Sequence, residues 1–125
     1  MAKSFSGHYK TGGSDVIVRV SVIFFEDSGS IVSYCPALNV YGYGSDEAGA
    51  KKSFEVSLGE FFRYTLNKGT LESELRKLGW TVSNTRKMYP PSFSDLLRNN
   101  EDFSEIFNHH DFKKEDRDIT IPTAA

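Results

Sequence analysis

The acidic residues are the first candidates for chemistry, because paired carboxylates can hold the two metal ions of a nuclease. The carboxylates nearest to the predicted first strand and long helix are Asp15, Glu26, Asp27, Asp46 and Glu47. None of them lies in the alternating core of that strand. They occupy the strand entrance, the following turn and the helix start, where Asp and Glu are common for structural reasons. A metal-dependent nuclease would need Asp15, Asp27 and a helix acid to converge.

The other reactive residue types also form no catalytic group in the sequence. His109 and His110 are adjacent, so they point apart on a regular element, and no HxxxH pattern accompanies them. His8 falls in the first residues of the chain. Cys35 is the single cysteine and lies in an apolar stretch, which predicts a buried thiol and no internal disulfide. We therefore expect a protein that is not an enzyme and that needs no metal or cofactor.

Three tyrosines, Tyr34, Tyr41 and Tyr43, could stack on RNA bases if they lie exposed on a sheet. The chain has 15 Lys and Arg against 17 Asp and Glu, a net charge of −2. Nucleic-acid-binding proteins usually carry a basic excess. The tyrosines are better explained as sheet packing or as a protein interface, where Tyr is enriched.

The elements that would position these residues follow from hydrophobic periodicity. Residues 16–25, 31–35 and 38–43 are rich in β-branched and aromatic residues and predict a three-stranded antiparallel meander. Ser45 is expected to cap a long helix that ends at Gly69, and Thr70 a shorter helix that ends at Gly79-Trp80. Residues 81–88 are expected to be a fourth strand that pairs back, parallel to an earlier one. The predicted class is α+β, in the order β-β-β-α-α-β.

Pro90 and Pro91 predict a boundary after this unit. We expect a loose leader at residues 1–13, a domain at 14–88 and a C-terminal extension at 89–125. In the extension, weak helices are predicted around Phe93 and Phe103, a solvated charged loop at 111–118, and a terminal β-like piece at 119–121.

The chain begins with polar residues and has no apolar run of the roughly 18 residues that a membrane helix needs. We expect a cytoplasmic protein that does not cross a membrane.

Two segments resemble the signature of the HicB-like antitoxins of bacteria. Residues 31–48 read IVSYCPALNVYGYGSDEA: an apolar strand, a Cys-Pro-x-Leu corner, a strand that ends in Gly-x-Gly, and an acidic helix start. Residues 75–80, LRKLGW, match the closing Leu-x-x-Leu-Gly-Trp of that family. The resemblance covers roughly residues 15–82, and it rests on the order and spacing of these pieces together.

The resemblance implies a partial ribonuclease H-like fold without the nuclease carboxylates. It also implies a function, which is to bind and neutralise a HicA-type toxin, a small mRNA-cleaving protein with a double-stranded-RNA-binding-like fold. In such pairs the antitoxin covers the catalytic histidine and the RNA surface of the toxin.

The C-terminal extension departs from the family pattern. Many members carry a DNA-binding helix-turn-helix or ribbon-helix-helix there, whereas residues 90–125 are acidic on balance and show no basic recognition helix. This argues against DNA binding. Our hypothesis is that the extension packs on the domain or reaches into the toxin.

The residues expected to contact a partner are aromatic or β-branched: Tyr34, Tyr41, Tyr43, Phe93, Phe103, Phe107, Ile119 and Ile121. The main alternative to an antitoxin is a solitary HicB-like regulatory or ligand-binding module without a toxin. Such a module could form a homo-oligomer through an edge strand.

Overall fold

The computed structural model describes residues 15–83 and 87–122, and the predicted leader at 1–13 lies outside them. The elements, in chain order, are β1 (Val16–Asp27), β2 (Ser30–Cys35), β3 (Val40–Gly44), α1 (Glu47–Lys68), α2 (Leu71–Lys77), β4 (Thr81–Val82), β5 (Met88–Tyr89), α3 (Phe93–Asn99), α4 (Glu101–His109) and β6 (Phe112–Ile121). The main sheet has the order β3-β2-β1-β6, with antiparallel neighbours throughout. The predicted α+β class, with its meander, long helix, short helix and a strand that pairs back, is confirmed.

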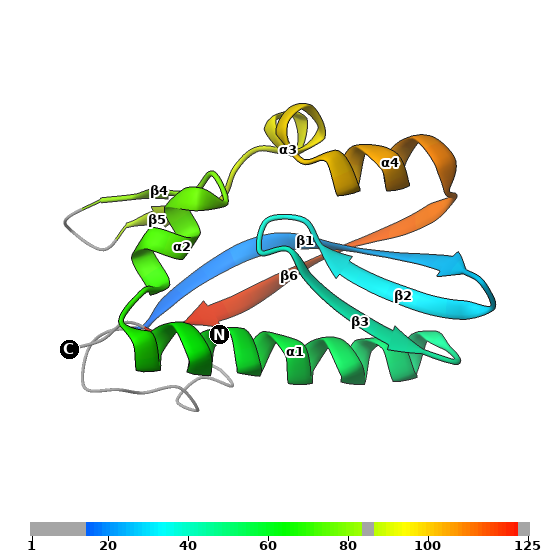
Figure 1. Ribbon diagram of the computed structural model, residues 1–125, viewed down its shortest axis with the longest axis horizontal. Helices are drawn as coiled ribbons and strands as arrows, with labels where there is room; N and C mark the ends of the chain where they lie inside the picture. The colour runs from blue at the N-terminus through cyan, green and yellow to red at the C-terminus, as the bar shows by residue number, and fades with distance from the viewer. Residues whose placement is uncertain (1–14, 84–86, 123–125) are drawn as a thin grey trace.

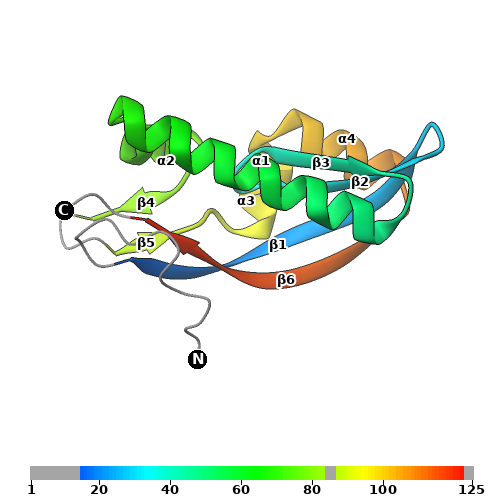
Figure 2. The same cartoon turned by 90° about the horizontal axis from the view of Figure 1, so that it is seen from below.

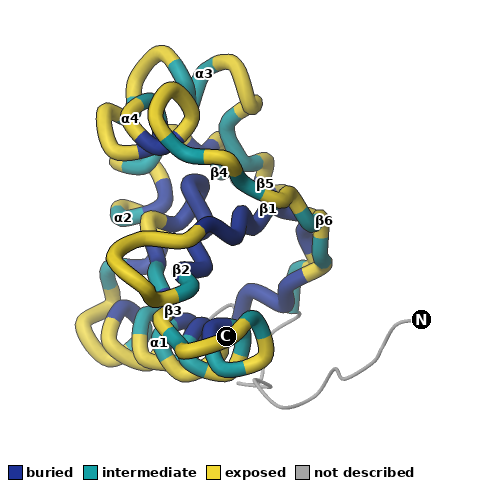
Figure 3. Tube along the Cα trace, turned by 90° about the vertical axis from the view of Figure 1, so that its right-hand side faces the viewer, coloured by how far each residue is buried: buried dark blue, intermediate teal, exposed yellow. Residues whose placement is uncertain are grey.

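The sheet is covered by helices on both faces. Figure 1 shows α1 along one face and α3 with α4 on the other. The residues of β1 alternate between these layers: Val18, Val20 and Val22 pack toward α1, whereas Ile23 and Phe25 belong to the cluster with α4. The buried stretches face one another between the helical layers in Figure 3. Period-two burial on both faces explains why the end of β1 is apolar without interruption.

The helix ends lie close to the capping residues of the sequence, although Thr70, at the N-cap of α2, makes no side-chain capping hydrogen bond. Asp46, rather than Ser45, is the N-cap of α1, and its carboxylate accepts a hydrogen bond from the Gly49 N–H at 2.7 Å. Gly69, with φ of +70°, ends α1 as predicted. After α2, Gly79 has φ of +96°, and the Trp80 N–H donates to the Leu75 carbonyl at 3.0 Å. This is the predicted Schellman motif.

The Gly-x-Gly at the end of β3 is required by the close approach of α1. A Cβ on Gly42 would lie 2.6 Å from the Ala50 carbonyl oxygen, and a Cβ on Gly44 would lie 2.5 Å from the Gly49 carbonyl carbon. The Ser33 hydroxyl donates to the same Ala50 carbonyl at 2.8 Å. Strand backbone and helix backbone are therefore in direct contact, with no room for a side chain between them.

The prediction of one strand over residues 81–88 is wrong. Residues 81–82 and 88–89 form β4 and β5, a separate antiparallel two-stranded sheet next to α2 (Figure 2). Next to this pair of strands, the Ser83 N–H donates to the Lys87 carbonyl at 2.9 Å. The strand that pairs back against β1 is β6, and it is antiparallel.

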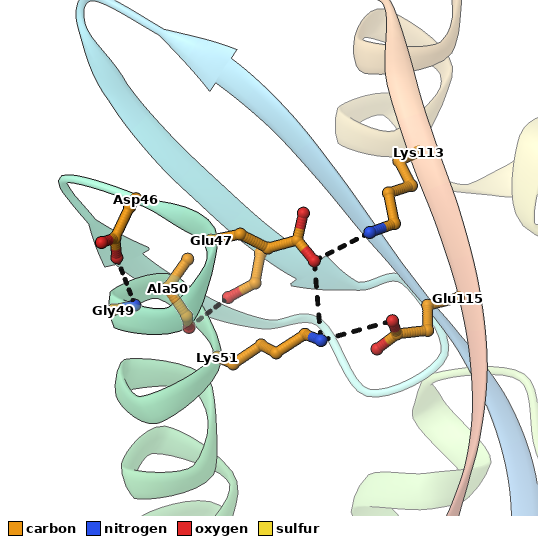
Figure 4. A network of polar contacts seen from close by, with 8 residues as sticks. Asp46, Glu47, Gly49, Ala50, Lys51, Lys113 and Glu115 are labelled. Carbon is orange, nitrogen blue, oxygen red and sulfur yellow. Dashed lines mark hydrogen bonds and ion pairs between the residues drawn. The ribbon is translucent and has the colours of Figure 1, made fainter.

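The predicted solvated loop at residues 111–118 is also wrong, because residues 112–118 belong to β6. Its odd-numbered side chains meet acidic and basic partners on α1, in the pairs Lys113–Glu47, Lys51–Glu115 and Arg117–Glu55. The spacing fits, since four helical residues rise about 6 Å and two strand residues about 6.6 Å. Charge alternates along both elements, so each pair joins opposite signs. Figure 4 shows Lys51 between Glu47 and Glu115, with Lys113 on the far side of Glu47.

We call these ion pairs between α1 and β6 the ion-pair ladder. Its contribution to stability should depend on pH. The hydrogen bond from Lys113, 2.8 Å long, lowers the pKa of Glu47, and the same bond raises the pKa of Lys113. The Glu47 contribution to stability is present above its unfolded pKa of roughly 4.3 and is lost as pH falls through the lowered folded value. The Lys113 contribution is present below roughly pH 10.4 and is lost as pH rises through the raised folded value.

A double-mutant cycle of Glu47→Gln and Lys113→Met should therefore show favourable coupling in the free energy of unfolding at pH 7. The coupling should shrink in 1 M NaCl and at pH 3. The control cycle pairs Lys113→Met with Glu60→Gln, whose carboxylate is bound by Arg63 instead, and should be additive. Equal coupling in both cycles would contradict the ladder.

In the described ranges no helix is both long and apolar enough to span a bilayer.

Candidate functional site

The two segments that carry the HicB-like resemblance touch one another. The Cys-Pro-x-Leu corner turns between β2 and β3, with the Leu38 N–H donating to the Cys35 carbonyl at 3.2 Å. The indole N–H of Trp80 donates to the Ala37 carbonyl at 2.7 Å, and Trp80 is buried. The closing Leu-Gly-Trp thus holds the corner between β2 and β3 through this hydrogen bond, next to the end of α2.

The three tyrosines form a stack across β2 and β3. Tyr34 and Tyr41 are register partners with ring centroids 4.2 Å apart, and the rings of Tyr41 and Tyr43 are 6.2 Å apart and nearly parallel. Burial falls along the stack: Tyr34 is fully buried, Tyr41 is intermediate and Tyr43 is 59% exposed. The stack therefore runs from the core to the surface on the face of the sheet that α4 covers.

The inner two hydroxyls hold the start of α4 on the sheet. The Tyr34 hydroxyl donates to Asn39 Oδ1 at 2.8 Å and accepts from Asn100 Nδ2 at 2.9 Å. The other end of the Asn100 amide caps α4 by accepting from the Phe103 N–H at 3.0 Å. The Tyr41 hydroxyl donates to Asp102 Oδ2 at 3.3 Å. Both sheet tyrosines are thus tied to the first turn of α4.

The tyrosine hydroxyls stay protonated in this setting. Burial raises the pKa of Tyr34, and the hydrogen bond with Asn100 opposes this in part. Burial also raises the pKa of Tyr41, and the neighbouring Tyr34 hydroxyl and Asp102 carboxylate raise it further. Because both pKa values are raised, each hydroxyl keeps its proton and acts as a donor at neutral pH.

Replacing Tyr34 by Phe should lower the free energy of unfolding by roughly 1–3 kcal/mol, because buried polar partners lose their hydrogen bond. It should also speed amide hydrogen exchange in α4, whose capping residue loses its anchor. The matched control is Tyr43→Phe, at the exposed end of the stack, which should change stability by no more than about 0.5 kcal/mol. Equal losses in the two variants, measured by urea unfolding, would refute this role of the Tyr34 hydroxyl.

A second aromatic cluster lies where α3 and α4 meet β6. The ring of Phe93 is 5.1 Å from that of Phe103 and 6.0 Å from that of Phe107, and Phe107 is 5.7 Å from Phe112. Phe103 is fully buried, whereas Phe93 and Phe107 are 36% and 41% exposed. The cluster packs α4 against the sheet and leaves Phe93 and Phe107 partly exposed.

Two hollows border the first turn of α4, and they share Asn100 and Glu101. The larger, of about 730 Å³, lies between α3, α4, the end of α2 and the corner; its lining includes Pro36, Asn39, Lys77, Asp95, Glu101 and Asp102. The smaller, of about 350 Å³, extends along α4 past Ser104 and Glu105. We call these two hollows and the α4 turn between them the α4 groove. Its carboxylates outnumber its cations.

The residues expected to contact a partner divide into two groups. Tyr34, Phe103, Ile119 and Ile121 are buried in the folded chain. Ile119 and Ile121 lie opposite Val18 and Val16 in the core between β6 and α1. Tyr41, Tyr43, Phe93 and Phe107 remain at the surface, so an interface can use only this second group directly.

Sequence reasoning did not identify Asn39, Asn100, Glu101 and Asp102 as site residues. The run Asn100-Glu101-Asp102 carries a local signal, since Asn is a good N-cap and acids favour the first helical turn. Nothing local indicates that two of these residues bind the tyrosines of β2 and β3. That pairing spans more than 60 residues of chain.

Several other reactive groups of the sequence make structural contacts in the part of the chain that the structure describes. There, no three His, Cys, Asp or Glu residues are grouped to hold a metal ion. Cys35 is a free, fully buried thiol, and burial raises its pKa to about 11. His110 packs on the ring of Phe25 at 5.0 Å. The predicted acids Asp46 and Glu47 serve as a helix cap and a ladder partner.

Comparison with models of protein families, with curated proteins and with solved structures found no match.

Proposed function

We propose that this chain is an antitoxin of the HicB-like kind, which binds and neutralises a HicA-type mRNA-cleaving toxin. The observation that carries the proposal is the hydrogen bond from Trp80 to the Ala37 carbonyl. It joins the two segments that resemble the family, which lie about forty residues apart in the chain. Two motifs that meet in space and share one hydrogen bond are better support for kinship than two separate sequence matches.

The aromatic side chains that stay at least partly exposed suit a protein partner. Tyr41, Tyr43, Phe93 and Phe107 present aromatic area on a rigid base, because their neighbours Tyr34 and Phe103 are fully buried. Aromatic residues with little freedom to lose are favoured at protein interfaces. Neutralisation would then be steric: the antitoxin covers the catalytic histidine and the RNA-binding face of the toxin, and supplies no chemistry itself.

A growth assay tests this proposal. The protein encoded beside this gene is expressed from an inducible promoter, with and without this chain, and colony formation is counted. The proposal predicts that the neighbour alone arrests growth and that co-expression restores it. A toxin variant that lacks its catalytic histidine serves as the non-toxic control. A neighbour that arrests growth equally in the presence of this chain would contradict the proposal, and would favour a solitary regulatory module.

A further inference from the structure

The two edges of the main sheet differ in how they are closed. One edge is β3, a strand of five residues, and its Tyr43 N–H donates to the Ser53 hydroxyl of α1 at 3.0 Å. The other edge is β6, a strand of ten residues that pairs with β1 along its whole length. No described strand pairs with the other side of β6, and Figure 2 shows it along the border of the sheet. The longer edge is therefore the open one.

An open edge presents backbone donors and acceptors to which another strand can add. The side chains of β6 limit which strand this can be, because residues 113–118 are all charged. Like charges directly opposite one another destabilise an antiparallel pair, whereas opposite charges stabilise it. An added strand must therefore match the order of charges along this segment.

A second copy of β6 can supply this match. Antiparallel pairing of two identical edges places a two-fold axis perpendicular to the sheet, so the two faces are kept and even-numbered residues lie opposite even-numbered ones. With the axis at Asp116, Lys114 lies opposite Asp118 of the second copy, and Glu115 lies opposite Arg117. Symmetry forms each of these favourable pairs twice. The one like-charged pair is Asp116 with itself.

The neighbouring registers are less favourable. An axis at Glu115 places Lys113 opposite Arg117 twice, and Glu115 opposite itself. An axis at Arg117 places Asp116 opposite Asp118 twice, and Arg117 opposite itself. The charges of this segment thus favour one register over those next to it, which is what a specific contact requires.

The ion pairs that these side chains already make leave them able to bind a second partner. The side chains of Lys114 and Asp118 are 43% and 49% exposed. Glu115 and Arg117 are part of the ion-pair ladder and remain partly exposed. A carboxylate accepts several hydrogen bonds and a guanidinium donates up to five. In the favoured register, Glu115 of one copy and Arg117 of the other would therefore join the ladders of the two copies.

We propose that two copies of this chain associate edge to edge through antiparallel pairing of β6, in the register centred on Asp116. The two main sheets then form one continuous sheet. The occupant is a second copy, because the complementary charges lie on the same segment. This inference does not rest on the proposed function.

The test measures self-association of the full chain by sedimentation velocity over a wide range of concentration. Asp118→Lys places a lysine opposite Lys114 twice in the dimer, and we expect it to weaken association by roughly tenfold. Lys114→Glu should do the same, because it places a glutamate opposite Asp118. The double variant, Lys114→Glu with Asp118→Lys, restores opposite charges and should recover most of the association. Thermal melts of all variants check that they are folded.

The matched control is Glu60→Lys on α1, since the carboxylates of Glu60 and Asp118 are each bound by one arginine. It should leave association unchanged. A second measurement uses the unaltered chain, in which hydrogen exchange of the amides of residues 113–118 should slow as concentration rises. A monomer at every concentration overturns the proposal. So does a dimer that Asp118→Lys leaves unchanged or that Glu60→Lys weakens equally, and so does a dimer without protection of this segment.

Discussion

Replacing Ile119 by alanine is expected to lower the free energy of unfolding by roughly 2–5 kcal/mol, the range for removing a buried Ile side chain. Ile119 is 2% exposed and packs in the core that β6 shares with β1 and α1. A domain of this size is stable by only about 5–15 kcal/mol, so this one change would remove a large part of the total. The variant should unfold at a markedly lower urea concentration.

The matched control is Ile17→Ala, on the strand paired with β6. Ile17 is 50% exposed and faces the opposite side of the sheet, so the same chemical change should cost about 1 kcal/mol or less. If Ile119→Ala is no more harmful than Ile17→Ala, then β6 is not part of the cooperative core. In that case the C-terminal residues would form a separable extension.

Replacing Gly42 by alanine is expected to destabilise the protein by at least about 3 kcal/mol, the upper end of the usual cost of overpacking. The added carbon would meet backbone atoms of α1 at Ala50 and Phe54, and neither can move without shifting the helix. Its third close neighbour, Ser33 Oγ, already donates a hydrogen bond to Ala50. We expect a loss of near-ultraviolet circular dichroism and a lower melting temperature.

Gly49→Ala provides the comparison within the same region. The added carbon would lie 3.2 Å from a carboxylate oxygen of Asp46, a side chain that can adjust, and alanine favours helices by about 1 kcal/mol over glycine. We expect a change of about 1 kcal/mol or less in either direction. A Gly42→Ala protein as stable as the Gly49→Ala protein would show that α1 does not pack on β3 as closely as described.

Local chemistry was enough to predict the first half of the fold. The meander follows from β-branched runs bounded by turn residues, and the ends of α1 and α2 follow from Gly69 and Gly79 in left-handed conformations. Each of these sequence signals lies within a few residues of the element that it predicts. They do not depend on which distant segment packs against them.

The last third of the chain could not be predicted in the same way. Residues 113–118 are all charged, with no alternation of apolar and polar residues, so they give no strand signal on their own. Their partners, Glu47, Lys51 and Glu55, are some 60 residues away on α1. Two features of the tertiary structure specify the strand: its ion pairs with α1 and the burial of Ile119 and Ile121 at its end. From the sequence alone, these two isoleucines predict only a short terminal β-like segment.

The candidate site shows the same division. The surface aromatics of β3, α3 and α4 were predicted as interface residues from their types alone. That Tyr34 is buried, and that it positions Asn39 and Asn100, depends on the fold of α4 back across the sheet. The C-terminal residues thus provide a strand of the sheet, a cover for one of its faces and the acidic wall of the groove. The hypothesis that they pack on the domain is confirmed in this respect, and contact with a toxin remains a prediction.

To measure whether this chain neutralises an mRNA-cleaving toxin by binding it, the purified chain is titrated into a cleavage assay of the purified neighbouring protein on a defined RNA. We expect cleavage to fall steadily and to stop near an equimolar amount of this chain, and a stable complex to elute as a single species. A cleavage rate that is unchanged in a tenfold excess of this chain, with no complex formed, would contradict the proposed function.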